Sequence, residues 1–214
     1  MNASFGGSRR TIALVIGAMV LAGCSAGGED GENSVGSPSP APTQAETSGP
    51  ARPTLTAAHL QPPSQDNKYT RAGKRPKVVV DPCTWIPDSS IQEIGFDPQS
   101  RRRGNDMIAE YSFLICNFKK GGDASLALES GNVSLDEVRS KYSGRTEELI
   151  INGRPALEVR KGGANDCSVD VQTKVGYLGI TVTITTDGLV KNMQPCENIL
   201  EIATVLESTI GKDN

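Results

Sequence analysis

The chain has 214 residues, with 22 Lys/Arg, 25 Asp/Glu and a formal net charge of −3. This length allows one domain with accessory segments, and the mildly acidic balance argues against nucleic acid as a partner. Aromatic residues make up only 4% of the chain, which argues against an aromatic ligand cage. The single histidine, His59, precedes the part of the chain that we expect to fold, so that part has no histidine for Ser-His or Cys-His catalysis or for metal binding.

Residues 1–23 are predicted to be a secretory signal peptide. Arg9 and Arg10 precede a short apolar run, and Leu21-Ala22-Gly23-Cys24 follows it. The apolar run is too short for a transmembrane helix, which needs roughly 20 residues. The segment resembles a bacterial lipobox, and the resemblance implies that the Cys24 thiol takes a diacylglyceryl group before cleavage at Gly23–Cys24. The Arg9-Arg10 pair is also compatible with twin-arginine export.

Residues 24–76 are predicted to be a lipid-anchored, disordered tether. They are rich in Pro, Ser, Gly, Thr, Ala and Gln, a composition that buries too little apolar surface to fold. Treated as a flexible coil, the 52 residues from 25 to 76 have a mean span of roughly 40 Å. Residues 77–214 are predicted to form a single domain, with 15 Lys/Arg and 20 Asp/Glu.

Four cysteines remain after Cys24, and an even number in an exported domain predicts two disulfides. We favour Cys83–Cys116 with Cys167–Cys196, because each pair would fix the start of a helix to a strand. Cys83–Cys196 with Cys116–Cys167 is the rival pairing, since sequence alone does not select one. The chain has no Cys-x-x-Cys motif, so neither a zinc site nor any cofactor is expected.

The first elements of the domain follow from capping and alternation. Asp81 and Pro82 predict a helix start, a second helical turn is expected to end at Gly95, and Tyr111, Phe113 and Ile115 are expected on one strand face. Ser134 and Glu137 form a capping box, and Asn152-Gly153 predicts a hairpin. The expected strands are 107–119, 124–128, 146–151, 155–160, 167–171 and 177–186, and the last helix is expected from Pro195 to Gly211. The pattern predicts an α+β domain with an antiparallel sheet of about six strands and flanking helices.

Several of these motifs together resemble a known family. They are Asp81-Pro82-Cys83 at a helix start, a strand-borne Cys116, the segment 152–156, Cys167-Ser168-Val169 and Pro195-Cys196. Behind a lipobox and a Pro/Ser-rich tether, this pattern resembles the actinobacterial lipoprotein family called domain of unknown function 3558. The resemblance implies a cell-surface location and a disulfide-linked α+β domain, and it brings no catalytic residue.

Candidate site residues each have a simpler structural explanation. Arg101-Arg102-Arg103 would suit an anionic headgroup or wall polymer, but a solvated loop is favoured. Glu147 and Glu148 are adjacent on a strand and point to opposite faces, so they do not form a glycosidase pair. Four other motifs could suggest a carboxylate pair, a calcium site, a phosphate loop and a glycosylation site, but each has a structural explanation. They are, in that order, Asp136-Glu137 as a cap, Asn165-Asp166 with Asp170 as turn residues, Gly162-Gly163-Ala164 as a loop, and Asn132-Val133-Ser134 as a helix start. Trp85 is expected in the core beside the first disulfide.

These observations predict a non-catalytic binding or sensing domain of unknown ligand, held at the outer face of the cytoplasmic membrane through the lipid on Cys24. A component of the cell envelope or wall is a possible partner. Two alternatives stay open. A carboxylate-dependent envelope enzyme would need two Asp/Glu side chains converging in a concave site with shifted pKa values, and a carrier of an apolar ligand would need a sizeable apolar cavity.

Overall fold

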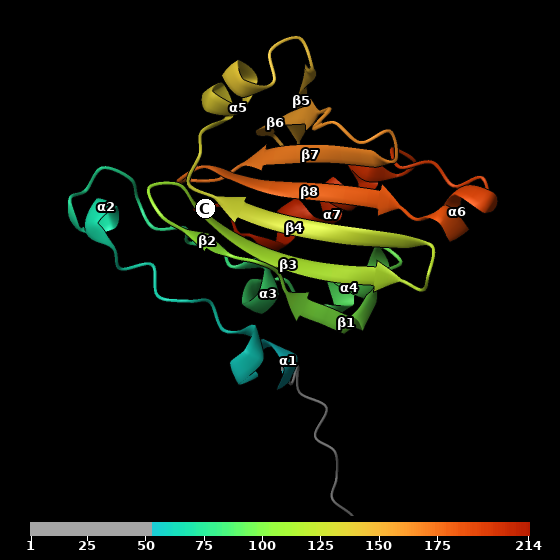
Figure 1. Cartoon of the computed structure of the whole chain (residues 1–214), viewed down its shortest axis with the longest axis horizontal. Helices are drawn as coiled ribbons and strands as arrows, with labels where there is room; N and C mark the ends of the chain where they lie inside the picture. Colours follow the sequence, from blue (N-terminus) through green and yellow to red (C-terminus); the bar gives the residue numbers. More distant parts are fainter. Residues whose placement is uncertain (1–52) are drawn as a thin grey trace, which may run out of the picture. The chain divides into compact units, whose positions relative to one another are not determined.

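One antiparallel sheet dominates the fold (Figure 1). The computed structural model describes residues 53–214. The strands run in the order β1-β3-β4-β8-β7-β6-β5, and β2 pairs with β3. Their bounds are β1 Asp97–Arg103, β2 Met107–Ile108, β3 Ser112–Lys120, β4 Ala124–Gly131, β5 Thr146–Ile151, β6 Arg154–Val159, β7 Asp166–Gln172 and β8 Tyr177–Ile184.

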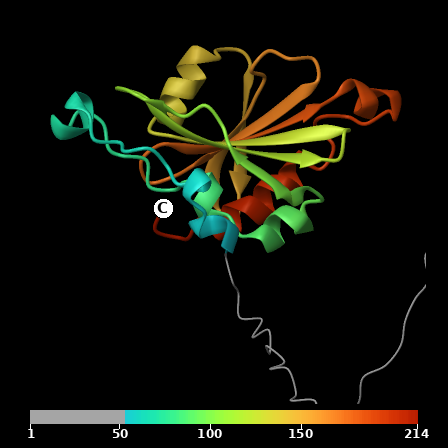
Figure 2. The same ribbon diagram turned by 60° about the horizontal axis from the view of Figure 1, so that its bottom comes forward.

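The helices lie on both faces of the sheet. In Figure 2, α3, α4 and α7 lie below the sheet, and α5 lies above it. The helical bounds are α1 Pro53–Thr56, η1 Ala58–Leu60, α2 Lys68–Arg71, α3 Pro82–Trp85, α4 Asp88–Glu93, α5 Leu135–Lys141, α6 Thr186–Val190 and α7 Ile199–Thr209. The fold is therefore α+β, as the sequence predicts, with eight strands in the sheet. Within residues 53–214, no helix combines the length and the hydropathy needed to cross a membrane.

The main core lies between the sheet and α3, α4 and α7. Leu114, Cys116 and Phe118 alternate along β3 toward this side, and all three are buried, as the alternation predicts. Each fully buried side chain of this size contributes about 1.5–3 kcal/mol of transfer free energy. A second, smaller cluster forms beneath α5, where Leu135 and Val138 pack with residues of β6 and β8.

Local sequence signals account for two elements closely. Asn152 and Gly153 both have positive φ (49° and 84°), the backbone that a two-residue hairpin turn between β5 and β6 requires. Ser134 caps α5 by accepting from the Glu137 amide, and Glu137 accepts in return from the Ser134 amide. Both predictions are confirmed.

Two disulfides link helical segments to strands. Cys83 is joined to Cys116, and Cys167 to Cys196, which is the pairing favoured from the sequence. Cys83 and Cys116 are fully buried in the main core, whereas Cys196 is exposed.

The folded part begins earlier than predicted. Residues 53–71 contain three short helical segments, and Leu55 and Leu60 are both buried. Leu60 belongs to the main core, and its carbonyl accepts from the Arg103 guanidinium. The boundary placed at residue 77 is therefore wrong, because apolar residues spaced among prolines still reach the core. His59, expected before the folded part, lies within it in η1. The predicted tether residues 24–52 lie outside the described residues.

Two other elements have bounds that differ from prediction, and two further elements were not predicted. The expected strand 107–119 is divided into β2 and β3, which form a tight hairpin in which Met107 pairs with Phe113. Tyr111 therefore lies in the turn and not on the face of β3. The last helix begins at Ile199 and not at Pro195, because Asn198 takes a left-handed backbone (φ 64°). Strand β1 and helix α6 were not predicted.

Candidate functional site

A groove of about 950 Å³ lies on the sheet face that carries α5. Its floor comes from β3, β4 and β8, and its walls come from α5, the segment after it and the β2–β3 hairpin. The lining residues include Met107, Tyr111, Phe113, Ile115, Ala127, Glu129, Val133, Glu137, Val138, Lys141, Tyr142, Lys161, Tyr177 and Thr181. Apolar and aromatic side chains predominate, which is typical of small-molecule sites.

A glycine makes room in the floor. Strand register places Glu129 of β4 and Asp170 of β7 on either side of Gly179 of β8. A Cβ atom at Gly179 would lie 2.9 Å from Asp170 Oδ1 and 3.4 Å from Lys161 Nζ. The missing side chain therefore leaves the space that the Lys161 ammonium occupies.

Four ionisable side chains meet at this floor. Lys161 Nζ donates to Asp170 Oδ1 (2.8 Å), and the Tyr177 hydroxyl donates to Glu129 Oε1 (2.6 Å). Asp170 is fully buried, and its Oδ2 has no partner among the described residues. Burial raises the pKa of Asp170, with Lys161 acting in the opposite direction. Burial and the charge of Glu129 raise the pKa of Tyr177, so its hydroxyl remains a neutral donor.

One end of the groove is held by an ion pair. Arg75 bonds to both carboxylate oxygens of Glu137 (2.6 and 3.3 Å) and lies over the ring of Tyr111, with its guanidinium carbon 4.1 Å from the ring centre. The contact with Arg75, followed by the hydrogen bonds from Ser134, lowers the pKa of Glu137 to about 2. Glu137 thus fixes both the start of α5 and the segment around residue 75.

The shifted pKa of Glu137 predicts a loss of stability in acid. Its folded-state pKa of about 2 lies below the ordinary value of 4.5, so the stabilisation is present above pH 4.5 and disappears as the pH falls toward 2. Because the side chain is partly exposed, we expect about 1 kcal/mol. Urea unfolding of the wild type and Glu137→Gln should differ by this amount at pH 6 and converge near pH 2. An equal difference at both pH values would contradict the assignment.

Aromatic residues are concentrated in the groove despite their scarcity in the chain. Tyr111, Phe113, Tyr142 and Tyr177 all line it, although the chain contains only nine aromatic residues in total. They come from three separate segments of the sequence, around residues 111–113, 142 and 177, and the composition alone argued against an aromatic site. The sheet register and α5 bring them together, with the rings of Phe113 and Tyr177 6.4 Å apart.

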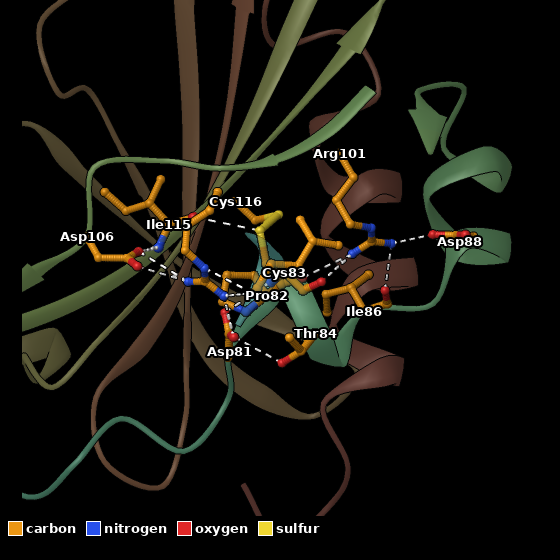
Figure 3. The surroundings of a disulfide bond; sticks show 12 residues. Asp81, Pro82, Cys83, Thr84, Ile86, Asp88, Arg101, Asp106, Ile115 and Cys116 are labelled. Atoms are coloured by element: carbon orange, nitrogen blue, oxygen red, sulfur yellow. Dashed lines mark hydrogen bonds and ion pairs between the residues drawn. A yellow bond between two sulfur atoms is a disulfide. The ribbon is translucent and has the colours of Figure 1, made fainter. Parts of the chain in front are cut away.

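The arginine run is not a solvated loop, which corrects the sequence interpretation. Arg101 and Arg103 lie in β1, and Arg101 is only 6% exposed (Figure 3). Arg101 donates to the carbonyl oxygens of Pro82, Cys83 and Ile86 and to Asp88 (2.6 Å). Three of its contacts therefore satisfy carbonyls at the end of α3, where a helix leaves acceptors unpaired.

Arg103 organises the other side of the Cys83–Cys116 disulfide. It bonds to Asp81 (2.5 Å), Asp106 (3.0 Å) and the Leu60 carbonyl. Asp81 in turn accepts from the Cys83 amide and from the Thr84 hydroxyl as the cap of α3 (Figure 3). Arg101 and Arg103 both bond to their own chain, so these two side chains serve the fold, whereas Arg102 between them is exposed.

The carboxylate pairs considered from the sequence supply one groove residue, Glu137, and no pair of carboxylates facing each other in the groove. Asp136 and Glu148 both pair with Arg139 on the surface, and Asp170 binds Lys161. Trp85 is not in the core as predicted. It is 37% exposed, because its Nε1 donates to the Thr209 carbonyl at the end of α7 and this bond holds the ring at the surface.

Among residues 53–214, one group of potential metal ligands lies close together. A carboxylate oxygen of Glu158 and the sulfurs of Cys167 and Cys196 are within 4.8 Å of one another. The two sulfurs are joined in a disulfide and are not available as thiolate ligands. The predicted lipidation residue, Cys24, lies outside the described residues.

Comparison with known families gives one match. No curated protein and no solved structure matches the chain. The model of one family, described as a protein of unknown function (DUF3558), matches residues 19–209. This range includes the groove, both disulfides and the buried arginines, so the chain belongs to the DUF3558 family.

Proposed function

We propose that this protein is an exported lipoprotein whose domain binds a small apolar or amphipathic ligand in the groove beneath α5. The observation that carries the proposal is the groove itself. Its volume of about 950 Å³ lies within the range typical of small-molecule sites, and its walls are mainly apolar and aromatic. The lipobox-like segment ending at Cys24 supports export and anchoring.

Binding is favoured over carboxylate-dependent catalysis by the state of the acidic groups. Asp170 has a raised pKa, but it is fully buried beneath Lys161 and does not line the groove. Glu137 is held by Arg75 and by the cap of α5. Glu129 is then the one groove carboxylate left accessible, whereas a glycosidase-type mechanism needs two.

Filling the groove should abolish binding. Ala127 lies in the floor on β4, and Ala127→Trp should remove any ligand that copurifies with the protein in native mass spectrometry. Ser125→Trp is the matched control, because Ser125 lies two residues away on the same strand and face but outside the groove. Loss of the ligand in both variants would indicate disruption of the sheet, and retention in Ala127→Trp would contradict the proposed site.

Removal of the proposed lipidation site should release the protein from the membrane. We expect Cys24→Ala to abolish labelling by a radioactive or clickable fatty acid and to leave an unprocessed or released precursor. A three-chain anchor binds far more firmly than the single acyl chain whose hold is marginal, so the change in detergent partitioning should be complete. If the Cys24→Ala protein is still processed and still partitions into the detergent phase, the lipoprotein assignment is refuted.

A further inference from the structure

We infer that the ligand is an amphipathic amine, with an apolar body in the groove and a positively charged nitrogen bound by Glu129. This inference rests on the proposed function of the groove as a ligand site. It is carried by the unusual position of Glu129, a half-buried carboxylate without a cationic partner in a site lined by aromatic rings.

The other charged groups of the groove are already accounted for. Glu137 is bonded by Arg75, and Lys161 is bonded by Asp170. Lys141 is exposed at the rim, where its ammonium lies 5.1 Å from the centre of the Tyr142 ring. Among residues 53–214, Glu129 is in none of the ion pairs, and the one hydrogen bond to its carboxylate comes from the neutral Tyr177 hydroxyl.

The cross-strand neighbours of Glu129 supply no positive charge for its carboxylate. Its cross-strand neighbours are Ile115 on one side and Gly179 on the other, and neither offers a polar side chain. A second carboxylate, that of Asp170, lies on the other side of Gly179 and accepts a hydrogen bond from the Lys161 ammonium. Among residues 53–214, Lys161 is thus the one cation in an ion pair with either of these two carboxylates, and it pairs with Asp170. A partly desolvated carboxylate such as that of Glu129 is stabilised by a further positive charge.

The aromatic lining suits the same ligand chemistry. Ring faces attract cations through their quadrupoles, and Phe113, Tyr142 and Tyr177 line the same groove as Glu129, with the Tyr177 hydroxyl bonded to its carboxylate. Met107, Ile115 and Val138 supply an apolar wall for the remainder of the molecule. An amine on an alkyl or aromatic body would match both parts of the groove.

Three probes of equal chain length test the inference: decylamine, decanol and decanoate. Titration calorimetry would use the full chain with Cys24→Ala in every sample, and binding that survives in Ala127→Trp would be subtracted as binding outside the groove. We expect decylamine to bind at least about tenfold more tightly than decanoate, the factor that a charge-assisted contact supplies. Glu129→Gln should weaken decylamine about tenfold and leave decanol unchanged.

Matched variants separate the possible outcomes. Glu201→Gln removes an exposed carboxylate on α7, which covers the other face of the sheet and contributes no lining residue, and should change nothing. Tighter binding of decanoate that is lost in Lys141→Gln would overturn the amine inference and leave the groove function intact. Failure of all three probes, with no copurifying ligand, would overturn both. If Glu129→Gln does not fold, the inference is still tested by comparing the affinities of the three probes for the protein in which Glu129 is unchanged.

Discussion

We expect Arg101→Ala to lower the free energy of unfolding by about 3–5 kcal/mol, as does the removal of one member of a buried charged network. The guanidinium contacts three backbone carbonyls around α3 and the Asp88 carboxylate, and it lies 4.9 Å from the centre of the Phe118 ring. Truncation would remove this donor from three carbonyls and from Asp88, beside a buried disulfide. Urea unfolding followed by far-UV circular dichroism would measure the loss.

The adjacent residue provides the control. Arg102 lies on the same strand but is exposed, so Arg102→Ala should change the unfolding free energy by less than about 0.5 kcal/mol. Arg101→Lys should recover only part of the stability, because an ammonium cannot reproduce the planar array of donors. Similar losses for Arg101→Ala and Arg102→Ala would mean that the buried contacts do not govern stability here.

The sequence predicts elements well where a short motif determines the backbone. Asn152-Gly153 requires positive φ at both positions, and Ser134 with Glu137 satisfies the free amides at a helix start, so each signal is independent of the rest of the chain. The α+β class and the disulfide pairing follow from such local elements, because each cysteine pair joins a helical segment to a strand.

Strand β1 shows why other elements escape prediction. Its sequence, DPQSRRR, has no apolar residue, and its charges indicate a loop. It is nevertheless the edge strand beside β3, and Arg101 is buried because acceptors from α3 and Asp88 surround it. Those partners are 13 to 19 residues away in the sequence, so no local pattern reveals them.

The charged floor of the groove likewise depends on how the strands pair, which the sequence of each strand does not show. Glu129, Gly179 and Asp170 become neighbours only because β8 pairs with both β4 and β7. Cys167, Val169 and Val171 alternate along β7 toward the core, but Ser168 and Asp170 on the opposite face are buried too, because Asp170 lies under Lys161. A sheet face half-covered by one short helix cannot be recognised from the strand sequences alone.

Removing the Cys83–Cys116 disulfide should cost more stability than removing Cys167–Cys196. The two loops span 33 and 29 residues, so the chain-entropy model gives about 3–4 kcal/mol for each bond. The difference comes from packing. Cys83 and Cys116 are both fully buried in the main core, and replacing them with alanine leaves a cavity that adds about 1 kcal/mol or more.

Two double variants measure this difference: Cys83→Ala with Cys116→Ala, and Cys167→Ala with Cys196→Ala. We expect the first to unfold at the lower urea concentration. In the unmutated protein, a mild reductant with thiol labelling should open Cys167–Cys196 first, because Cys196 is exposed and an attacking thiolate can reach it. Labelling of Cys83 before Cys196 under native conditions would show that the α3 segment opens independently of the sheet. In that case the contacts of Arg101 and Arg103 would not hold the α3 segment against the core. The large loss of stability expected for Arg101→Ala would then be contradicted as well.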